Sequence, residues 1–340
     1  MTTDEQLDQA DQRAAGAATT MRAMVQDTYG SADVIRLAQI NRPVPAAGEV
    51  LVRVVAAGLD RGTWHLMTGT PYLMRLVCGL RGPRNPVLGR DVAGTVVAVG
   101  SKVTRFVIGD EVYGMGSGSF AEYVAVRESK LARKPANLTF EQAAVVPISA
   151  GTALQALDAG RLQPGQQVLI TGASGGVGSF AVQLAKGLGA EVTGVCSTGK
   201  VDLVRSLGAD HVVDYTFTDF TTSGQRYDVI IDIAGNSPLS RLRRVLTATG
   251  TLLIVGAENA GKLTGMSRQL RAPVVSMFVR QRLSSLVSKE QSSVLDRLTQ
   301  LIENGTVVPS VDRIYPLADV PAAMRQLTAG NVRGKVAISI

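Results

Sequence analysis

A group of glycines in the middle of the chain has the residue type and spacing that phosphate binding requires. Gly172, Gly175 and Gly178 follow the apolar residues 168–170, and an apolar pattern with helical spacing resumes directly after them. Between a strand and a helix, such glycines bring backbone N–H groups and the positive end of the helix dipole close to a pyrophosphate. The loop therefore predicts a dinucleotide site, with Ser174, Gly175, Gly176 and Val177 as its cofactor-binding residues.

The elements around this loop decide between a binding site and a purely structural turn, because a glycine triplet alone is a weak signal. From residue 168 onward, short apolar segments alternate with segments of helical periodicity. This alternation predicts an α/β fold with a doubly wound parallel sheet of the Rossmann type. The predicted strands cover residues 168–170, 191–198, 227–232 and 250–256, and the predicted helices cover residues 201–207 and 239–246.

The chain before the glycine loop follows a different pattern. Short alternating runs, such as residues 49–55 and 94–100, are separated by turn residues throughout residues 21–147. This pattern predicts a smaller β-rich domain, and a length of 340 residues favours two domains. A helix over 294–305 and a strand over 335–340 are predicted to complete the chain.

Composition and charge exclude several classes of protein. The net charge of +7 invites a nucleic-acid partner, but the basic residues are scattered and aromatic residues make up only 4% of the chain. We therefore expect no nucleic-acid partner and interpret the charge as attraction for an anionic cofactor. No apolar run approaches the roughly 20 residues that span a bilayer, so we expect no membrane span. The polar residues 1–20 predict a disordered tail, and two separated cysteines are consistent with a cytoplasmic protein.

Nearly the whole chain takes part in a resemblance to a known family. The matching segments are residues 86–100, 109–114, 120–124, 134–138 and 172–178. With these segments the chain resembles the medium-chain dehydrogenases/reductases, and within them the zinc-independent quinone oxidoreductase-like branch. It looks closest to the reticulon-interacting-protein subgroup and to bacterial proteins labelled NAD(P)-dependent alcohol dehydrogenase.

The resemblance implies a division of the chain and a place for the active site. Residues 21–147 and 289–340 would form a GroES-like catalytic domain, and residues 148–288 would form a Rossmann NADP-binding domain. The active site would lie in the cleft between these domains. The family also implies a homodimer, with residues 250–256 and 274–278 as the contact surface.

Zinc is the first question that the resemblance raises. Asp60 stands where zinc-dependent relatives place their first cysteine, and Arg90 and Asp91 stand where they place a His-Glu pair. A guanidinium would repel a metal ion, and the four-cysteine structural zinc loop is missing. We therefore expect no metal, although Asp60, Asp91 and His65 leave a residual alternative.

Cofactor preference depends on the residues that follow the second strand. An NAD-preferring site normally has an acid there, whereas this chain has Ser197, Thr198 and Lys200. Hydroxyl groups and an ammonium suit a 2′-phosphate, so we expect NADPH; the alternative for Lys200 is a solvated surface lysine. By resemblance, Ser197 and Tyr215 contact this phosphate, and Arg333 and Asn331 lie in another segment that contacts the cofactor.

The acceptor end of the site is the least determined by the sequence. By resemblance, Asp60 and Thr152 are the catalytic residues beside the nicotinamide, and the contacting loops hold Ala234, Val255, Gly256 and Ala257. Apolar and aromatic residues over 64–74 are predicted to wall a hydrophobic pocket, unless they serve ordinary core packing.

These residues include neither a metal site nor an obvious general acid, which disfavours simple alcohol oxidation. We therefore expect a zinc-independent, NADPH-dependent oxidoreductase that transfers hydride to a small apolar quinone or α,β-unsaturated carbonyl. A dedicated biosynthetic enoyl reductase or an alcohol dehydrogenase is one alternative. A protein that binds NADPH as a sensor or structural protein, without turnover, is another.

Overall fold

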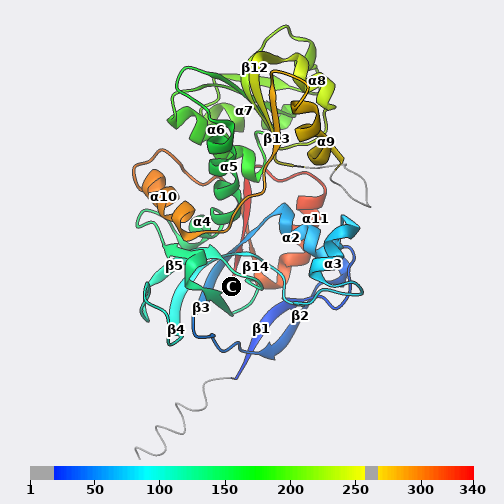
Figure 1. The fold of residues 1–340 in the computed structure, drawn as a ribbon. Helices are drawn as coiled ribbons and strands as arrows, with labels where there is room; N and C mark the ends of the chain where they lie inside the picture. Colours follow the sequence, from blue (N-terminus) through cyan, green and yellow to red (C-terminus); the bar gives the residue numbers. More distant parts are fainter. Residues whose placement is uncertain (1–18, 257–266) are drawn as a thin grey trace, which may run out of the picture.

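The computed structural model describes residues 19–256 and 267–340. These residues form two lobes, each built around a large sheet (Figure 1). The upper lobe of Figure 1 holds six parallel strands in the order β10-β9-β8-β11-β12-β13, which confirms the predicted Rossmann-type sheet. The strands are β8 (Gln167–Thr171), β9 (Glu191–Cys196), β10 (His211–Asp214), β11 (Tyr227–Asp232), β12 (Leu246–Ile254) and β13 (Arg282–Ser285).

Helices cover both faces of this sheet because successive strand residues point to opposite sides. Ile170 and Ile231 join the apolar cluster that includes residues of α5 (Pro147–Gly160), α6 (Gly176–Gly187) and α7 (Val201–Ser206). Leu169 and Ile230 join a second cluster with residues of α8 (Leu239–Arg244) and α9 (Ser267–Ser276). The strand interiors are therefore buried on both faces, which explains their continuous apolar composition.

The strand order reverses at β8. This strand pairs with β9 on one side and with β11 on the other, so the chain builds the sheet outward in two directions from this point. Ligands of doubly wound sheets bind outside the carboxyl ends of the strands at such a switch point. By this rule, the position directly after Thr171 is the expected place for a ligand.

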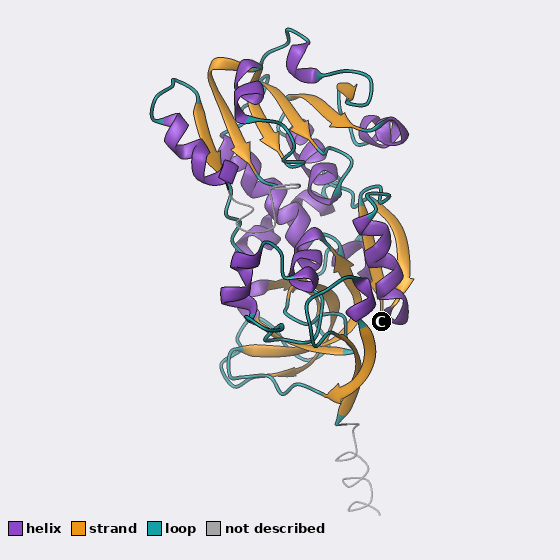
Figure 2. Cartoon of the chain, turned by 90° about the vertical axis from the view of Figure 1, so that its right-hand side faces the viewer, coloured by secondary structure: helices purple, strands orange, loops and turns teal. Residues whose placement is uncertain are grey.

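The lower lobe contains a seven-stranded sheet with the order β14-β15-β3-β4-β5-β7, and β6 pairs with β3. Its C-terminal strand β15 runs antiparallel to β3, so the end of the chain lies in the lower lobe. Figure 2 shows the two sheets at opposite ends of the molecule with helices between them. The strands are β3 (Glu49–Leu59), β4 (Asp91–Val99), β5 (Glu111–Met115), β6 (Tyr123–Arg127), β7 (Leu131–Arg133), β14 (Val311–Pro316) and β15 (Lys335–Ser339), and a separate pair is formed by β1 (Thr20–Val25) and β2 (Arg36–Asn41).

One apolar cluster continues from the upper lobe into the lower one. It contains Ala93 and Tyr113 of the lower sheet together with Leu295 of α10 (Ser292–Glu303) and residues of α4 (Phe140–Ala144) and α5. The Tyr113 hydroxyl donates a hydrogen bond of 2.9 Å to the Leu295 carbonyl oxygen. The junction between the lobes is thus a packed core. The lower lobe also contains α2 (Arg61–Thr68), α3 (Arg75–Cys78) and α11 (Val320–Thr328), and residues of α2 and α11 join a separate core of that lobe.

Several predicted boundaries are wrong by a few residues. Thr20 already belongs to β1, so the predicted tail is too long at its end, while residues 1–18 lie outside the described residues. Leu246 opens β12 and does not end the preceding helix. The predicted dimer surface includes residues 250–256, which belong to β12. This strand is not an edge of the sheet, because β13 pairs with it.

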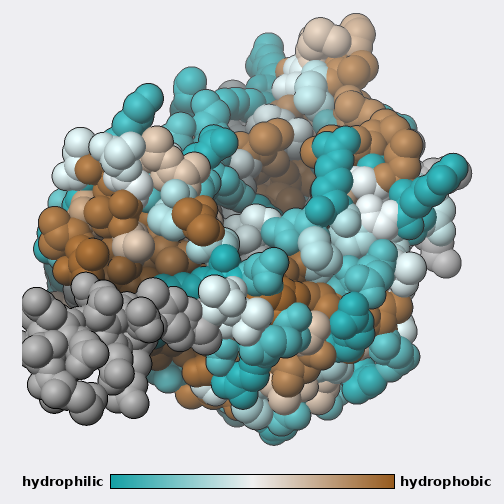
Figure 3. Space-filling view, turned by 90° about the horizontal axis from the view of Figure 1, so that it is seen from below, coloured by the Kyte–Doolittle hydropathy of each residue, from teal (hydrophilic) through white to brown (hydrophobic). Residues whose placement is uncertain are grey.

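Two findings concern the surface. Over residues 19–256 and 267–340, no helix combines the length and apolar character that crossing a bilayer requires. Seen from below in Figure 3, hydrophobic residues gather at the left of the lower lobe and again at its upper right. The hydrophobic residues at the upper right lie on the side of the molecule where Figure 1 draws α3.

Candidate cofactor and acceptor site

The glycine loop lies at the carboxyl end of β8, where the strand order reverses. Gly172 has a φ of +69°, in the left-handed region that favours glycine. A Cβ atom on Gly178 would lie 2.1 Å from the carbonyl oxygen of Gly172, so no side chain fits there. Gly175 caps α6, whose first backbone N–H groups have no partner within the helix. This geometry fits the pyrophosphate that the sequence predicts beside Ser174, Gly175, Gly176 and Val177.

A buried lysine that the sequence analysis missed lies against this loop. The Lys335 side chain is 1% exposed, and its Nζ donates to the Ser149 hydroxyl at 2.9 Å and to the Leu59 carbonyl oxygen at 3.1 Å. A Cβ atom on Gly176 would lie 3.0 Å from the Cδ atom of Lys335. The first turn of α6 therefore packs against the aliphatic part of this lysine, whose ammonium is held by the lower lobe and by Ser149 of α5.

The segment after α11 connects the glycine loop to the end of the second strand. The Gly334 backbone N–H donates to the Ser174 carbonyl oxygen at 2.8 Å. The Lys200 ammonium donates to the carbonyl oxygens of Gly330 and Val332, both at 2.8 Å. Lys200 is therefore half-buried against this segment, and the alternative of a fully solvated surface lysine is wrong.

The other residues predicted to contact this end of the cofactor follow the carboxyl ends of β9 and β10 or lie in the segment that Lys200 contacts. Ser197 caps the short 3-10 helix over Thr198–Lys200, and the Thr198 hydroxyl lies 2.9 Å from the Thr216 hydroxyl. Tyr215 is 60% exposed, so its ring is accessible to a ligand. Asn331 and Arg333 lie in the segment that Lys200 holds, and the Arg333 backbone N–H donates to Asp312. The structure thus brings these predicted residues to one edge of the sheet.

The predicted nicotinamide loops are tied together by Asp232 at the end of β11. Its Oδ1 accepts hydrogen bonds from the Thr171 hydroxyl at 2.7 Å and from the Gly235 backbone N–H at 3.3 Å. Its carbonyl oxygen accepts from the backbone N–H groups of Val255 and Gly256. Ala234 donates to the Thr171 hydroxyl. Ala257 lies outside the described residues.

Arg268 of α9 completes this anchor and was also missed by the sequence analysis. Its guanidinium pairs with the buried Asp232 carboxylate and donates to the Gly235 carbonyl oxygen. The helix that carries Arg268 begins directly after residues 257–266, which are outside the described part of the chain. The ion pair fixes the loop after β11, so removal of Arg268 would release a backbone that is predicted to contact the nicotinamide.

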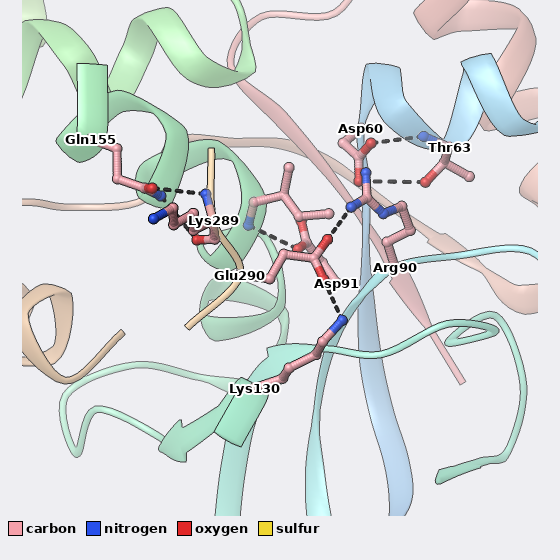
Figure 4. A network of polar contacts seen from close by, with 9 residues as sticks. Asp60, Thr63, Arg90, Asp91, Lys130, Gln155, Lys289 and Glu290 are labelled. Atoms are coloured by element: carbon pink, nitrogen blue, oxygen red, sulfur yellow. Dashed lines mark hydrogen bonds and ion pairs between the residues drawn. The ribbon is translucent and has the colours of Figure 1, made fainter. Parts of the chain in front are cut away.

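A polar network lies where the resemblance places zinc ligands in other family members (Figure 4). The Arg90 guanidinium lies between the carboxylates of Asp60 and Glu290 and pairs with Glu290. Lys130 donates to the second oxygen of Glu290 at 2.6 Å. Burial opposes the charge on Arg90, but the neighbouring carboxylates outweigh it and raise the pKa of Arg90. This position therefore holds a permanent cation.

Asp91, the neighbour of Arg90, is completely buried. Its Oδ1 accepts a hydrogen bond of 2.9 Å from the Ile148 backbone N–H, and its Oδ2 lies 3.8 Å from the Lys335 ammonium. Burial raises the pKa of Asp91 to about 8, although the Lys335 charge opposes this shift. Asp91 thus connects the acceptor end of the site to the lysine beneath the glycine loop.

The structure gives Asp60 a role that the sequence analysis did not predict. Asp60 caps α2, because its Oδ1 accepts the Thr63 backbone N–H at 2.8 Å. The predicted catalytic role of Asp60 stays a prediction, as does that of Thr152, which is half-buried on α5. His65 Nδ1 lies 2.6 Å from the Thr70 carbonyl oxygen, so its imidazole is engaged locally.

The predicted apolar wall over 64–74 is not a single surface. Met67 is 1% exposed and belongs to the core of the lower lobe, where Trp64 packs against the same cluster. Tyr72 and Leu73 are 43% and 49% exposed at the surface. The first part of the segment is therefore packed in the core and the second part is exposed, because helix α2 turns one face inward and ends before Gly69.

The residues that the structure describes offer few groupings of metal-binding side chains. Those residues contain no group of three or more His, Cys, Asp or Glu side chains that could hold a metal ion. At the position of interest, Arg90 and Lys130 occupy the space around Glu290 (Figure 4). Cationic side chains therefore surround the carboxylate, and this arrangement does not fit a divalent metal ion.

Comparison with known families agrees with both lobes. Residues 46–136 match the alcohol dehydrogenase GroES-like domain, and residues 207–338 match a domain described as zinc-binding dehydrogenase. The chain belongs to the medium-chain dehydrogenase/reductase family, in its quinone oxidoreductase-like branch. It is an oxidoreductase with a nicotinamide cofactor, as predicted.

Individual relatives align with almost the whole chain. The chain is 33% identical to the NAD(P)H oxidoreductase RTN4IP1, mitochondrial, of Mus musculus, over 95% of this chain and 90% of the relative. It is 34% identical to the NADPH-dependent alkenal/one oxidoreductase, chloroplastic, of Arabidopsis thaliana, over 94% and 79% of the two chains. The solved quinone oxidoreductase from Coxiella burnetii superposes with a TM-score of 0.84 at 28% identity, over 94% and 99% of the two chains.

Proposed function

We propose that this protein is a zinc-independent reductase that transfers hydride from NADPH to a quinone or an α,β-unsaturated carbonyl. The observation that carries the proposal is the Arg90 network, which holds a hydrogen-bonded cation at the place of a metal ion. A guanidinium stabilises negative charge that is already delocalised, as on the oxygen of a reduced quinone or an enolate. The names of the relatives, which include quinone and alkenal/one oxidoreductases, support the same acceptor class.

The residues of this chain would act mainly by binding and orientation. The α6 N-terminus, with the Lys335 side chain packed against its first turn, would hold the pyrophosphate, and the Asp232–Arg268 pair would fix the loop beneath the nicotinamide. The bound cofactor supplies the hydride. Arg90 is 32% exposed, and we propose that its exposed part faces the acceptor oxygen. Solvent supplies the proton, because Asp91, the carboxyl with the raised pKa, is fully buried and its oxygens face the Ile148 N–H and the Lys335 ammonium.

Turnover with matched acceptors tests the reaction. We expect the full chain to oxidise NADPH with 1,4-benzoquinone and with cyclohex-2-enone, and to leave the saturated cyclohexanone unreduced. Comparable turnover of cyclohexanone would favour the alcohol dehydrogenase alternative. Tight binding of NADPH without turnover of any acceptor would contradict the proposal and favour a sensor or a dedicated enoyl reductase.

Elemental analysis tests the absence of zinc. We expect no stoichiometric zinc in the purified protein and no loss of activity with a chelator, because Arg90 is paired with Glu290. One tightly held zinc per chain, with activity lost on its removal, would overturn this part of the proposal.

The preference for NADPH is supported by Lys200 and the hydroxyl groups around it. Replacing Lys200 with Asp should weaken NADPH by roughly ten- to hundredfold, since a charge-assisted hydrogen bond is worth about 1.5–3 kcal/mol. Lys200 also donates hydrogen bonds to the carbonyl oxygens of Gly330 and Val332. The Lys200→Met variant loses these hydrogen bonds without adding a negative charge, so it is the control for loss of the loop contacts. Equal losses of NADPH and NADH affinity in Lys200→Asp would contradict the assignment.

We also propose that the chain forms a homodimer through β13. This strand is an edge of the six-stranded sheet, and Met277 and Phe278 beside it are 74% and 81% exposed. Light scattering at micromolar concentration should report two chains per particle. A monomer would contradict the proposal without affecting the reaction.

A further inference from the structure

The segment between Asp60 and Asp91 has an unusual charge. Residues 61–90 contain five arginines and no aspartate or glutamate, so this stretch carries a charge of +5 in a chain with a net charge of +7. Arg90 is turned into the polar network, and Arg61 lies half-buried at the start of α2. Arg81 and Arg84 are exposed, and Arg75 lies between them and α2 in the sequence.

Large apolar side chains are exposed in the same segment. They belong to the 3-10 helix over Tyr72–Met74, to α3 and to the turn that follows it. Figure 1 draws α3 at the right of the lower lobe beside α2, and Figure 3 shows hydrophobic residues next to protruding hydrophilic ones on that side. The exposed fractions are 43% for Tyr72, 49% for Leu73, 60% for Leu76, 72% for Val77 and 68% for Leu80.

Specific contacts hold this segment in place from behind. Arg75 Nε donates to the Gly69 carbonyl oxygen at 2.9 Å, and its guanidinium lies 4.6 Å from the ring centroids of both Tyr29 and Tyr72. The Tyr29 hydroxyl donates to the Gly79 carbonyl oxygen at 2.7 Å. The apolar side chains are therefore exposed on a supported backbone, and the described residues 19–256 and 267–340 do not cover them.

The size and charge of the surface indicate what covers it. Its exposed apolar side chains present on the order of 500 Å², less than the roughly 800 Å² that each partner buries in a stable protein–protein interface. Within residues 61–90 every charged side chain is an arginine, and the neighbouring Asp27 is paired with Arg36. A surface that pairs with its own copy would bring these arginines together. Apolar side chains beside arginines are typical of segments that lie in the headgroup region of an anionic membrane.

We propose that residues 72–84, the docking surface, bind a lipid bilayer that contains anionic lipids. Leu76, Val77 and Leu80 enter the interfacial region, and Arg81 and Arg84 pair with lipid phosphates. The docking surface is joined to the acceptor end of the site by α2, which Asp60 caps. An apolar acceptor dissolved in the bilayer would then reach the enzyme directly; this consequence rests on the proposed function, but the lipid binding does not.

Co-sedimentation of the full chain with vesicles tests the proposal. We expect binding to vesicles of phosphatidylcholine mixed with phosphatidylglycerol, weak binding to phosphatidylcholine alone, and release by added salt. The double variant Leu76→Asp/Val77→Asp should abolish this binding. The double variant Arg81→Gln/Arg84→Gln should weaken it about thirtyfold, since each basic residue near an anionic surface contributes roughly a factor of five.

Two matched variants control for general loss of apolar surface or charge. Val107 and Ile108 are 64% and 66% exposed elsewhere on the lower lobe, so Val107→Asp/Ile108→Asp introduces the same charges at a different apolar site. Arg53 and Arg127 are exposed on the lower sheet, so Arg53→Gln/Arg127→Gln removes the same net charge. Both controls should bind vesicles like the unmodified chain, and all variants should retain their thermal unfolding transition and NADPH binding.

Three outcomes would overturn the proposal. The first is no binding to anionic vesicles by the unmodified chain. The second is an equal loss of binding in the control variants. The third is a dimer in solution that Leu76→Asp/Val77→Asp converts to a monomer, which would make the docking surface an interface between copies. Turnover of water-soluble acceptors is measured separately, so failure of the reaction and failure of lipid binding are distinguishable.

Discussion

The two ends of the site are built in different ways. At the glycine loop, the proposed binding groups are backbone N–H groups whose positions follow from a strand, a turn and a helix that are consecutive in the sequence. At the acceptor end, the groups are side chains from distant parts of the chain, since Arg90 and Glu290 are 200 residues apart. Local backbone geometry therefore determines the first end, and tertiary packing determines the second.

This difference predicts how each end responds to substitution. A change in the glycine loop disturbs the backbone itself, whereas a change in the Arg90 network disturbs a balance of charges that the remaining residues partly retain. The loop should therefore show large, steric effects on cofactor binding. The network should show smaller, electrostatic effects that depend on pH.

The largest effect is expected for Gly178→Val. A Cβ atom there would lie 2.1 Å from the Gly172 carbonyl oxygen, so the loop must shift before any side chain fits. Such overpacking costs about 1–3 kcal/mol or more, and NADPH affinity should fall by roughly a hundredfold. Cofactor fluorescence titration measures this loss.

Gly48→Ala is the matched control, because a Cβ atom on Gly48 would meet nothing within 4 Å. This variant should bind NADPH as the unmodified chain does. Retained NADPH affinity in Gly178→Val would show that the glycine loop does not hold the pyrophosphate.

The next effect is expected for Glu290→Gln. Burial opposes the charge on Glu290, but the hydrogen bond from Lys130 and the charge of Arg90 outweigh it and hold the pKa of Glu290 below its ordinary value of 4.5. Its contribution to stability is therefore present above that value and lost as the pH falls through the folded-state pKa. At neutral pH the variant should lose about 1.5–3 kcal/mol in the free energy of unfolding, because two cations lose their shared carboxylate.

The exposed pair of Asp158 and Arg297 provides the control for Glu290. These side chains are 47% and 48% exposed, so Asp158→Asn should cost at most about 1 kcal/mol. Urea unfolding at neutral pH compares the two variants. Equal losses would mean that the Arg90 network is no more than a surface ion pair.

The same contrast explains what the sequence could predict. The Rossmann sheet and the glycine loop were predictable because apolar runs, glycine positions and helical spacing are local signals. The end of α8 and the start of β12 were predicted wrongly because an apolar residue such as Leu246 suits either element. Only its pairing with Tyr227 assigns Leu246 to the strand. No sequence signal marked Lys335, Arg268 or Glu290, since each acquires its role from contacts that the fold creates.

An effect that appears only in the pH dependence of stability is expected for Asp91→Asn. Burial raises the pKa of Asp91 from 3.8 to about 8, so between these values the folded state holds a proton that the unfolded chain releases. This contribution to stability is complete below the ordinary pKa and is lost as the pH rises through the folded-state pKa. The stability of the unmodified chain should therefore fall across this window relative to Asp91→Asn, which cannot titrate.

Urea unfolding at several pH values across that window measures the two slopes. The Asp158→Asn variant, altered at an exposed carboxylate, should keep the slope of the unmodified chain. Parallel curves for the unmodified chain and Asp91→Asn would mean that Asp91 is charged in the folded protein, stabilised by the Lys335 ammonium.

The smallest effect is expected for Asp60→Asn, and it tests whether the acceptor end contains a hidden acid. Asp60 Oδ1 accepts the Thr63 backbone N–H, and asparagine caps a helix about as well as aspartate. The variant should therefore keep the helix cap, lose less stability than Glu290→Gln and lose less than about tenfold in turnover, since general acid catalysis is typically worth about 10² to 10⁴. Asp60→Ala, which removes the cap, should instead cost about 0.5–2 kcal/mol of stability. A loss of about 10² or more in Asp60→Asn, with NADPH binding and stability intact, would make Asp60 the proton donor and refute the proposal that solvent supplies the proton.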